Sequence, residues 1–228
     1  MATSTVEDYL KRIYLEQPAD SGARMPTGQL AQSLGVTPGT ATAMIKTLAD
    51  SGLVLYEPYG GVRLTEAGSK LAARVIRRHR LVELFLVEVV GMNWSEVHAE
   101  AEVLEHAVSE RLIELIDAML GHPATDPHGD PIPTAGGELR MLDPHESLIA
   151  CPTGVSRLVA RITDQRAEFL RLLEDRGLMP GRRVVVLSRD EMADTVEVQT
   201  DDAAQLRLGF RAASRVLVRP DDSRRGGT

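Results

Sequence analysis

Residues 27–65 read TGQLAQSLGVTPGTATAMIKTLADSGLVLYEPYGGVRLT, and the order of signals in this stretch decides the fold. The apolar spacing predicts a helix over about 27–34, a turn at Gly35-Val36 and a second helix over about 38–51. Thr37-Pro38 is a strong helix start, because a threonine hydroxyl can accept an orphan amide and proline fits the first helical position. Two short strands with a Gly-Gly tip follow, so the stretch predicts a winged helix-turn-helix.

The second of these helices has one apolar face, formed by Ala41, Met44, Ile45 and Leu48, which should pack on the preceding helix. The opposite face is small or polar, so its backbone could approach base edges in a major groove. A helical hairpin without a DNA role is the alternative, which the wing and a mildly basic charge disfavour. The candidate DNA-contacting residues are Thr37, Pro38, Gly39, Thr40, Thr42, Ala43, Lys46, Tyr59 and Arg63.

The net charge of −7 conceals a strong asymmetry along the chain. Residues 1–80 carry 10 Lys/Arg against 7 Asp/Glu, a balance of +3. Residues 81–150 carry 2 against 14, a balance of −12, together with five of the six histidines. A basic first part fits nucleic acid and an acidic, histidine-rich middle fits cations, although a solvated acidic face is the alternative.

Three helices are expected around this middle region. An amphipathic helix covers 6–17; another, capped by Thr65, covers about 66–90 and ends at Gly91; a third runs from about residue 95 to Gly121. On the third, one face within about 100° holds four ligand-type side chains beside an apolar stripe. These four residues are His98, Glu102, Glu105 and His106.

Carboxylates at a packed boundary cost several kcal/mol each unless a cation pairs them. No Lys or Arg lies between Arg80 and Arg111 to do this locally, so a bound metal ion is the most economical partner. His79 and Glu83, four residues apart on the preceding helix, could chelate one ion or simply share a hydrogen bond. Oxygen and imidazole ligands suit Mn²⁺ or Fe²⁺.

Other classes of protein find little support. No HExxH motif or cysteine pair is present, and no nucleophile or general base stands out, so we expect no enzyme and no organic cofactor. A metal-dependent hydrolase is the weakest alternative. No apolar run approaches about 18 residues, so no membrane partner is expected. The acidic start excludes a signal peptide, and with Cys151 as the single cysteine we expect a cytoplasmic location.

Nearly the whole chain resembles the diphtheria-toxin-repressor family of iron- and manganese-dependent regulators. The resemblance rests on the winged segment and on several motifs, with GLMPGRRVVVL resembling the SH3-like module of three-domain members. The other motifs are EDYLKRIY (7–14), RRHRLVELFL (77–86), EVHAEAEVLEHAVS (96–109) and DPHGDPIP (126–133).

The resemblance implies two metal sites per chain. The activating site would use Asp8, Glu102, Glu105 and His106. The ancillary site would use His79, Glu83, His98 and, from the third domain, Gln165 and Glu168. Iron-type members carry methionine at the position of Asp8 and cysteine at the position of Glu102. Carboxylate oxygens replace those two sulfur ligands here, which favours Mn²⁺, with Fe²⁺ possible. Two-domain manganese regulators have glutamate at the position of Lys11 and use the histidine that matches His79 in a two-metal cluster. His79 could therefore belong to either the ancillary or the activating site.

The expected fold is a mainly α N-terminal winged helix-turn-helix with a helical dimerisation domain, followed by an all-β SH3-like small barrel. The expected boundaries are 1–66 for DNA binding, 67–135 for metal binding and dimerisation, 136–150 for a linker, 151–220 for the SH3-like domain and 221–228 for a tail. The implied function is a homodimeric repressor, activated by Mn²⁺, that binds palindromic double-stranded DNA operators of metal-homeostasis genes. An Fe²⁺ sensor and a winged-helix regulator of an organic ligand are the alternatives.

Overall fold

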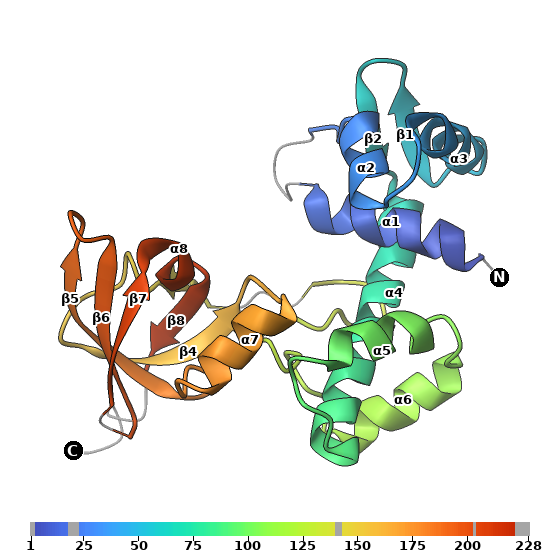
Figure 1. Ribbon diagram of the computed structural model, residues 1–228. Helices are drawn as coiled ribbons and strands as arrows, with labels where there is room; N and C mark the ends of the chain where they lie inside the picture. The colour runs from blue at the N-terminus through green and yellow to red at the C-terminus, as the bar shows by residue number, and fades with distance from the viewer. Residues whose placement is uncertain (1–2, 18–22, 140–142, 203, 222–228) are drawn as a thin grey trace. The chain divides into compact units, whose positions relative to one another are not determined.

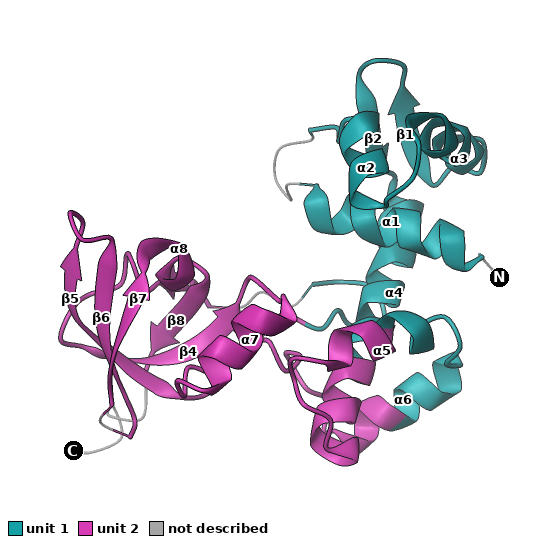
Figure 2. Ribbon diagram, viewed as in Figure 1, with its two compact units in different colours: residues 1–81, 102–115, 132–140 teal, residues 82–101, 116–131, 141–228 magenta. Residues whose placement is uncertain are grey.

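The computed structural model describes residues 3–17, 23–139, 143–202 and 204–221 (Figure 1). The chain forms two compact units (Figure 2). Unit 1 comprises residues 1–81, 102–115 and 132–140, and unit 2 comprises residues 82–101, 116–131 and 141–228. Nearly all of the expected tail, 222–228, lies outside the described residues.

Unit 1 begins with the predicted winged helix-turn-helix. The Thr37 hydroxyl caps α3 by accepting from the Thr40 amide at 3.2 Å, as its sequence predicts. β1 and β2 pair antiparallel, with Val54 opposite Leu64. The fully buried residues Leu10, Ile13, Leu30 and Ile45 bring α1, α2 and α3 into one core. The elements are α1 (Ser4–Glu16), α2 (Thr27–Ser33), α3 (Pro38–Asp50), β1 (Val54–Glu57) and β2 (Gly61–Leu64).

The next helix, α4 (Glu66–Phe85), starts as predicted, since the Thr65 hydroxyl accepts from the Gly68 amide at 3.1 Å. Its continuation over Leu86–Val90 is a π-helical turn rather than an α-helical one. The run ends at Gly91, whose φ of 81° is the left-handed conformation that glycine adopts readily. The predicted end of this helix is therefore confirmed.

The prediction of one continuous helix from about residue 95 to Gly121 is wrong. α5 (Val97–Leu104) ends before a turn at residues 105–108, which we call the acidic turn, and α6 (Glu110–Met119) starts a new helix. The break has a local cause, because the Ser109 hydroxyl accepts from the Leu112 amide at 3.2 Å and caps α6. Glu105 and His106 therefore lie on a turn, and a helical wheel does not describe their directions.

Unit 2 contains a six-stranded antiparallel sheet in the order β3-β8-β4-β5-β6-β7. Alternate residues such as Val196 and Val198 are buried, and α7 adds Leu170 and Leu173 to the same core. The predicted strands and the fold class are confirmed. The elements are β3 (Glu146–Ser147), β4 (Ser156–Ile162), α7 (Ala167–Glu174), β5 (Arg183–Asp190), β6 (Thr195–Thr200), β7 (Gln205–Gly209), α8 (Phe210–Ala213) and β8 (Val216–Pro220).

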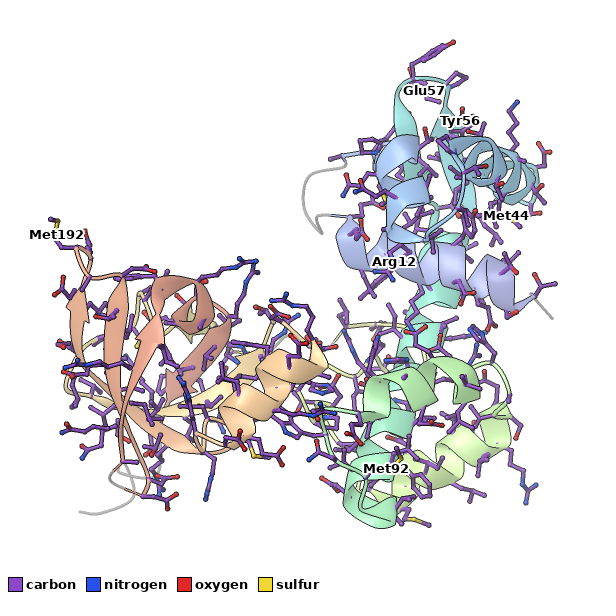
Figure 3. The ribbon with its side chains drawn as sticks, viewed as in Figure 1. Arg12, Met44, Tyr56, Glu57, Met92 and Met192 are labelled. Atoms are coloured by element: carbon purple, nitrogen blue, oxygen red, sulfur yellow. The ribbon has the colours of Figure 1, made fainter. Side chains whose placement is uncertain are left out.

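The short strand β3 and the four-residue helix α8 were not expected from the sequence. Figure 3 shows Met192 at the tip of the β5–β6 hairpin, where its side chain is fully exposed. Among the described residues, no helix is both long and apolar enough to cross a membrane.

Candidate metal centre

The acidic turn of unit 1 is built around a fully buried carboxylate. Glu105 has 0% relative exposure, and its two oxygens lie 2.9 and 2.7 Å from Lys11 Nζ. The same ammonium donates to Glu102 Oε1 at 2.7 Å. Lys11 lies on α1 and is only 7% exposed. The lack of a local lysine or arginine therefore does not leave these acids unpaired, because a cation reaches them from a distant segment.

His79, on α4, belongs to the same cluster. Its Nδ1 lies 3.1 Å from Lys11 Nζ and 2.5 Å from Glu105 Oε2. One ring nitrogen cannot accept from the lysine and donate to the carboxylate at once, so the tautomer decides which bond forms. In both cases the histidine is held against Glu105.

His106 lies between two carboxylates of α1. Its Nε2 is 2.9 Å from Asp8 Oδ1 and 3.4 Å from Glu105 Oε1. Its Nδ1, on the other side of the ring, is 2.7 Å from Glu7 Oε2. The sequence reasoning did not single out Glu7, although its position beside Asp8 on α1 was a signal.

Arg78 fixes the surroundings of this histidine. Its guanidinium contacts Glu7 Oε1 at 2.8 Å and Glu110 Oε1 at 2.9 Å, and its Nε donates to the Glu105 carbonyl oxygen at 2.8 Å. Burial acts to lower the pKa of Arg78, but the hydrogen bonds and charges of Glu7 and Glu110 outweigh it and raise that pKa. One buried cation thus ties α1 to the backbone of the acidic turn.

Two candidate ligand sets in unit 1 share Glu105. In one set the partners are Asp8 and His106, and in the other they are His79 and Glu102; the ligand atoms of each set lie within 4.8 Å of one another. Carboxylate oxygens with one imidazole are donors that Mn²⁺ and Fe²⁺ accept, so the residues fit a divalent ion. Burial raises the pKa of Asp8 from its ordinary 3.8; His106 opposes this, and the charges of Glu105 and Glu102 add to it.

Unit 2 holds a separate candidate set of three buried residues, Glu83, Asp126 and His128. His128 Nδ1 faces Glu83 Oε2 at 3.8 Å and, within the described part of the chain, has no hydrogen-bond partner. Its Nε2 donates to the Trp94 carbonyl oxygen at 2.9 Å, which leaves Nδ1 as the nitrogen with a free lone pair. His98 Nδ1 is 3.1 Å from the other oxygen of Glu83.

The loop that carries this set is tightly fixed. The Asp126 carboxylate accepts from the amides of His128 at 2.8 Å and Asp130 at 2.9 Å. The His128 carbonyl oxygen accepts from the Ile162 amide of β4 at 2.8 Å. Gly129 has a φ of 87°, and a Cβ there would collide with the Ala160 carbonyl oxygen, so glycine is required. The motif DPHGDP signalled this loop, but Asp126 and His128 were not predicted as ligands.

The remaining predicted ancillary residues are placed differently. Gln165 donates to Asp130 Oδ2 at 2.6 Å, which puts it beside the same loop of unit 2. Glu168 is exposed in the first turn of α7 and is in none of the candidate ligand sets found among the described residues. Of the expected ancillary set, the structure of unit 2 thus pairs His98 with Glu83.

The predicted DNA-contacting residues form the outer face of α3 and the wing. Most are exposed, and Tyr59 at the wing tip is fully so, with a positive φ of 65°. The Thr42 hydroxyl donates to the Pro38 carbonyl oxygen of its own helix at 2.8 Å, so it is already engaged. Lys46 is exposed in the middle of α3. Met44, labelled in Figure 3, packs partly buried against the core of unit 1.

Comparisons with known proteins agree with this geometry. Residues 1–62 match the N-terminal DNA-binding domain of iron-dependent repressors, and residues 65–134 match their metal-binding and dimerisation domain. Residues 147–220 match the FeoA domain. The chain belongs to the iron-dependent repressor, or diphtheria-toxin-repressor, family of metal-dependent transcriptional repressors, a family of regulators rather than enzymes.

The individual relatives include both iron-dependent and manganese-dependent repressors. The iron-dependent repressor IdeR of Mycobacterium tuberculosis is 34% identical over 194 residues, covering 80% of this chain and 83% of its own. The regulator MntR of Lysinibacillus sphaericus is 33% identical over 127 residues, covering 54% and 89%. A solved manganese-dependent transcriptional repressor in complex with manganese has 44% identity and a TM-score of 0.84, covering 94% of this chain and 99% of its own.

Replacing Asp8 by asparagine separates stability from metal response. Because the pKa of Asp8 is raised in the fold, its stabilising contribution is present at low pH and is lost as pH rises through the raised value. At neutral pH we expect Asp8→Asn to melt no lower than the natural protein in chelator, and to lose the rise in melting temperature on adding Mn²⁺ at the unit 1 site. Thermal melts with and without Mn²⁺ measure both; a full Mn²⁺-induced rise in the variant would contradict the prediction.

Replacing Lys46 by alanine tests the outer face of α3. A lost phosphate contact weakens binding to all DNA sequences alike and lowers the steepness of the salt dependence by about 0.9 per contact. Affinity measured over a range of salt concentrations gives this slope. Lys70→Ala, on α4 and paired with Glu66, is the matched control. An unchanged slope for Lys46→Ala would exclude that residue from the DNA contact.

Proposed function

We propose that this chain is a homodimeric repressor that Mn²⁺ activates and that binds palindromic operators of metal-homeostasis genes. The observation that carries the proposal is the convergence of α1 with the acidic turn. Asp8 of α1 lies within hydrogen-bonding distance of His106, and α1 is part of the core of the winged helix-turn-helix. An ion held by both segments would fix the orientation of the DNA-binding helices, which is a population shift rather than a new contact with DNA.

Manganese is the preferred ion on the chemistry of the donors. The three carboxylates Asp8, Glu102 and Glu105 offer hard oxygen, and no sulfur ligand lies among the candidate sets found in the described residues. The similarity to a manganese-bound repressor supports this choice. Iron is the second candidate, because IdeR proteins are similar over most of this chain. Membership of a metal-dependent family favours an ion over an organic effector.

The primary site would hold a single ion. Lys11 Nζ lies inside the set of His79, Glu102 and Glu105, at 2.7 to 3.1 Å from all three side chains. An ammonium at this position excludes a second cation, by volume and by charge repulsion. The ion would therefore be bound by Asp8, Glu105 and His106, with Glu102 as a further ligand on the lysine side.

The ancillary site would be the set in unit 2. Glu83, Asp126 and His128 supply two oxygens and one nitrogen, with His98 next to Glu83. Three buried ligands with one unpaired imidazole nitrogen are better explained by an ion than by packing, since buried polar atoms are normally satisfied. His79 is assigned to the primary region, and Gln165 supports the loop through Asp130.

An ion bound by Asp8, Glu105 and His106 would supply the positive charge that holds these side chains together. Before binding, Lys11 and His79 already hold Glu105, so the acidic turn is not forced apart by simple repulsion. Burial raises the pKa of Asp8, so its ionised carboxylate is disfavoured where it lies and would gain from a nearby cation. Asp8 is therefore the residue whose charge couples α1 to the ion.

The dimer would form through α6. Leu112, Leu115 and Met119 are 44%, 56% and 66% exposed, and they fall within about 60° on one face of the helix. An apolar stripe of this kind on a charged helix indicates a covered surface. A two-fold dimer places two winged domains on half-sites about 34 Å apart, so the operator should be an inverted repeat.

Replacing one ligand of each set by glutamine tests the two sites. Glu105→Gln keeps the side-chain volume and leaves an amide oxygen for Lys11 to donate to, so we expect a folded dimer. This variant should bind one Mn²⁺ fewer per chain. Its affinity for the operator should be the same with Mn²⁺ and with chelator. His128→Gln should lose the other ion. Metal analysis after dialysis and a DNA-shift assay give the two readouts. Glu100→Gln, exposed on α5, is the control; DNA binding by the natural protein that is as tight in chelator would contradict the function itself.

Removing the ammonium should change the number of ions. Lys11→Met leaves Glu102 and Glu105 without their cation, so a second Mn²⁺ should enter beside the first. Electron paramagnetic resonance distinguishes an exchange-coupled pair of Mn²⁺ ions from isolated ions. The natural protein should show isolated ions and Lys11→Met a coupled pair, with Lys70→Met as the control. A coupled pair in the natural protein, or a folded variant without one, would contradict the single-ion site.

A further inference from the structure

Glu7 is the least exposed carboxylate of α1, with a side chain 12% exposed, and it is in none of the candidate ligand sets of the described residues. A carboxylate with so little contact with water requires strong partners. Its two oxygens have one each: Oε1 receives Arg78 at 2.8 Å, and Oε2 is 2.7 Å from His106 Nδ1. Glu7 therefore joins a buried arginine to a candidate metal ligand.

The two nitrogens of His106 have different tasks. Nε2 faces Asp8 and Glu105, the other members of its ligand set, whereas Nδ1 faces Glu7. Without an ion, both nitrogens face carboxylates that can accept a proton from them, and the nitrogen that binds an ion must give up its proton. The carboxylate of Glu7 would keep the proton on Nδ1, so that Nε2 is the nitrogen that loses its proton and presents its lone pair to the ion.

Arg78 holds the Glu7 carboxylate in the orientation that faces His106. Arg78 is 8% exposed, and its guanidinium donates to Glu7 from one nitrogen, to Glu110 from another and to the Glu105 carbonyl oxygen from its Nε. The same side chain thus positions the carboxylate that orients His106 and the backbone of the ligand Glu105. Outer partners of this kind fix the tautomer and raise the basicity of a metal-bound histidine.

We propose that Glu7 is a positioning residue of the metal switch, which selects the His106 tautomer that presents Nε2 to the ion and acts only through that histidine. The proposal rests on the proposed function, because it concerns the same site. It places a determinant of metal affinity on α1, one residue before Asp8. A ligand and its orienting partner then both come from the helix that carries the DNA-binding core.

The tautomer can be measured on the natural protein without metal. Imidazole ¹⁵N chemical shifts of His106, assigned with a His106→Gln sample, distinguish a proton on Nδ1 from one on Nε2. We expect a proton on Nδ1, whether or not Nε2 carries a second proton for Asp8. An Nδ1 without a proton in the natural protein would overturn the proposal whether or not any variant folds.

The companion experiment compares Glu7→Gln with Glu110→Gln, which removes the other carboxylate on Arg78, 67% exposed, without touching His106. Glu7→Gln should weaken Mn²⁺ binding at the unit 1 site about 10- to 100-fold, with Glu7→Asp restoring part of it. Glu110→Gln should change it by less than about fivefold. At saturating Mn²⁺, DNA affinity should be the same for all of them, which a merely structural role of Glu7 would not give.

The outcomes separate this proposal from the function on which it rests. Normal Mn²⁺ affinity in folded Glu7→Gln, with a metal-dependent natural protein, would overturn the role of Glu7 alone. An equal loss in Glu110→Gln would also overturn it, since the effect would then belong to Arg78. A natural protein that takes up no Mn²⁺ at this site would remove both the function and the proposal.

Discussion

The structure of unit 1 depends on the charge balance at one buried carboxylate. Glu105 has no contact with water, so its charge must be compensated inside the protein, and breaking such a pair costs about 3–5 kcal/mol. Lys11 from α1, His79 from α4 and the Arg78 bond to the Glu105 carbonyl oxygen converge on this one residue. Three segments that are distant in sequence are thereby held together, and the candidate ligand atoms of unit 1 are positioned as a consequence.

The same arrangement explains how an ion could control DNA binding from outside the DNA contact. α1 buries Leu10 and Ile13 in the core that also holds α2 and α3, while its polar side carries Glu7, Asp8 and Lys11 to the acidic turn. Whatever stabilises that polar side stabilises the placement of the whole winged helix-turn-helix. α1 therefore connects the acidic turn directly to the core of the winged helix-turn-helix.

Sequence reasoning predicted the winged helix-turn-helix, the cap at Thr37, the end at Gly91 and the strands of the sheet, because each depends on local periodicity or on one capping residue. It missed one local signal, the Ser109 cap that starts α6 and interrupts the expected continuous helix. Its other failures had causes that were not local, since the partner of Glu102 and Glu105 is Lys11, far away in the chain. The placement of Asp126 and His128 depends on loop hydrogen bonds that no periodicity encodes.

The hydrogen bond from the Ile162 amide to the His128 carbonyl oxygen bears on how freely such proteins can be recombined. A loop that offers candidate metal ligands takes part of its conformation from a strand of the C-terminal sheet. The sheet is therefore not independent of the loop: replacing it would remove a contact that fixes the conformation of the candidate binding loop. Chimeras that exchange this region between relatives should preserve the loop and its strand as a single inherited block.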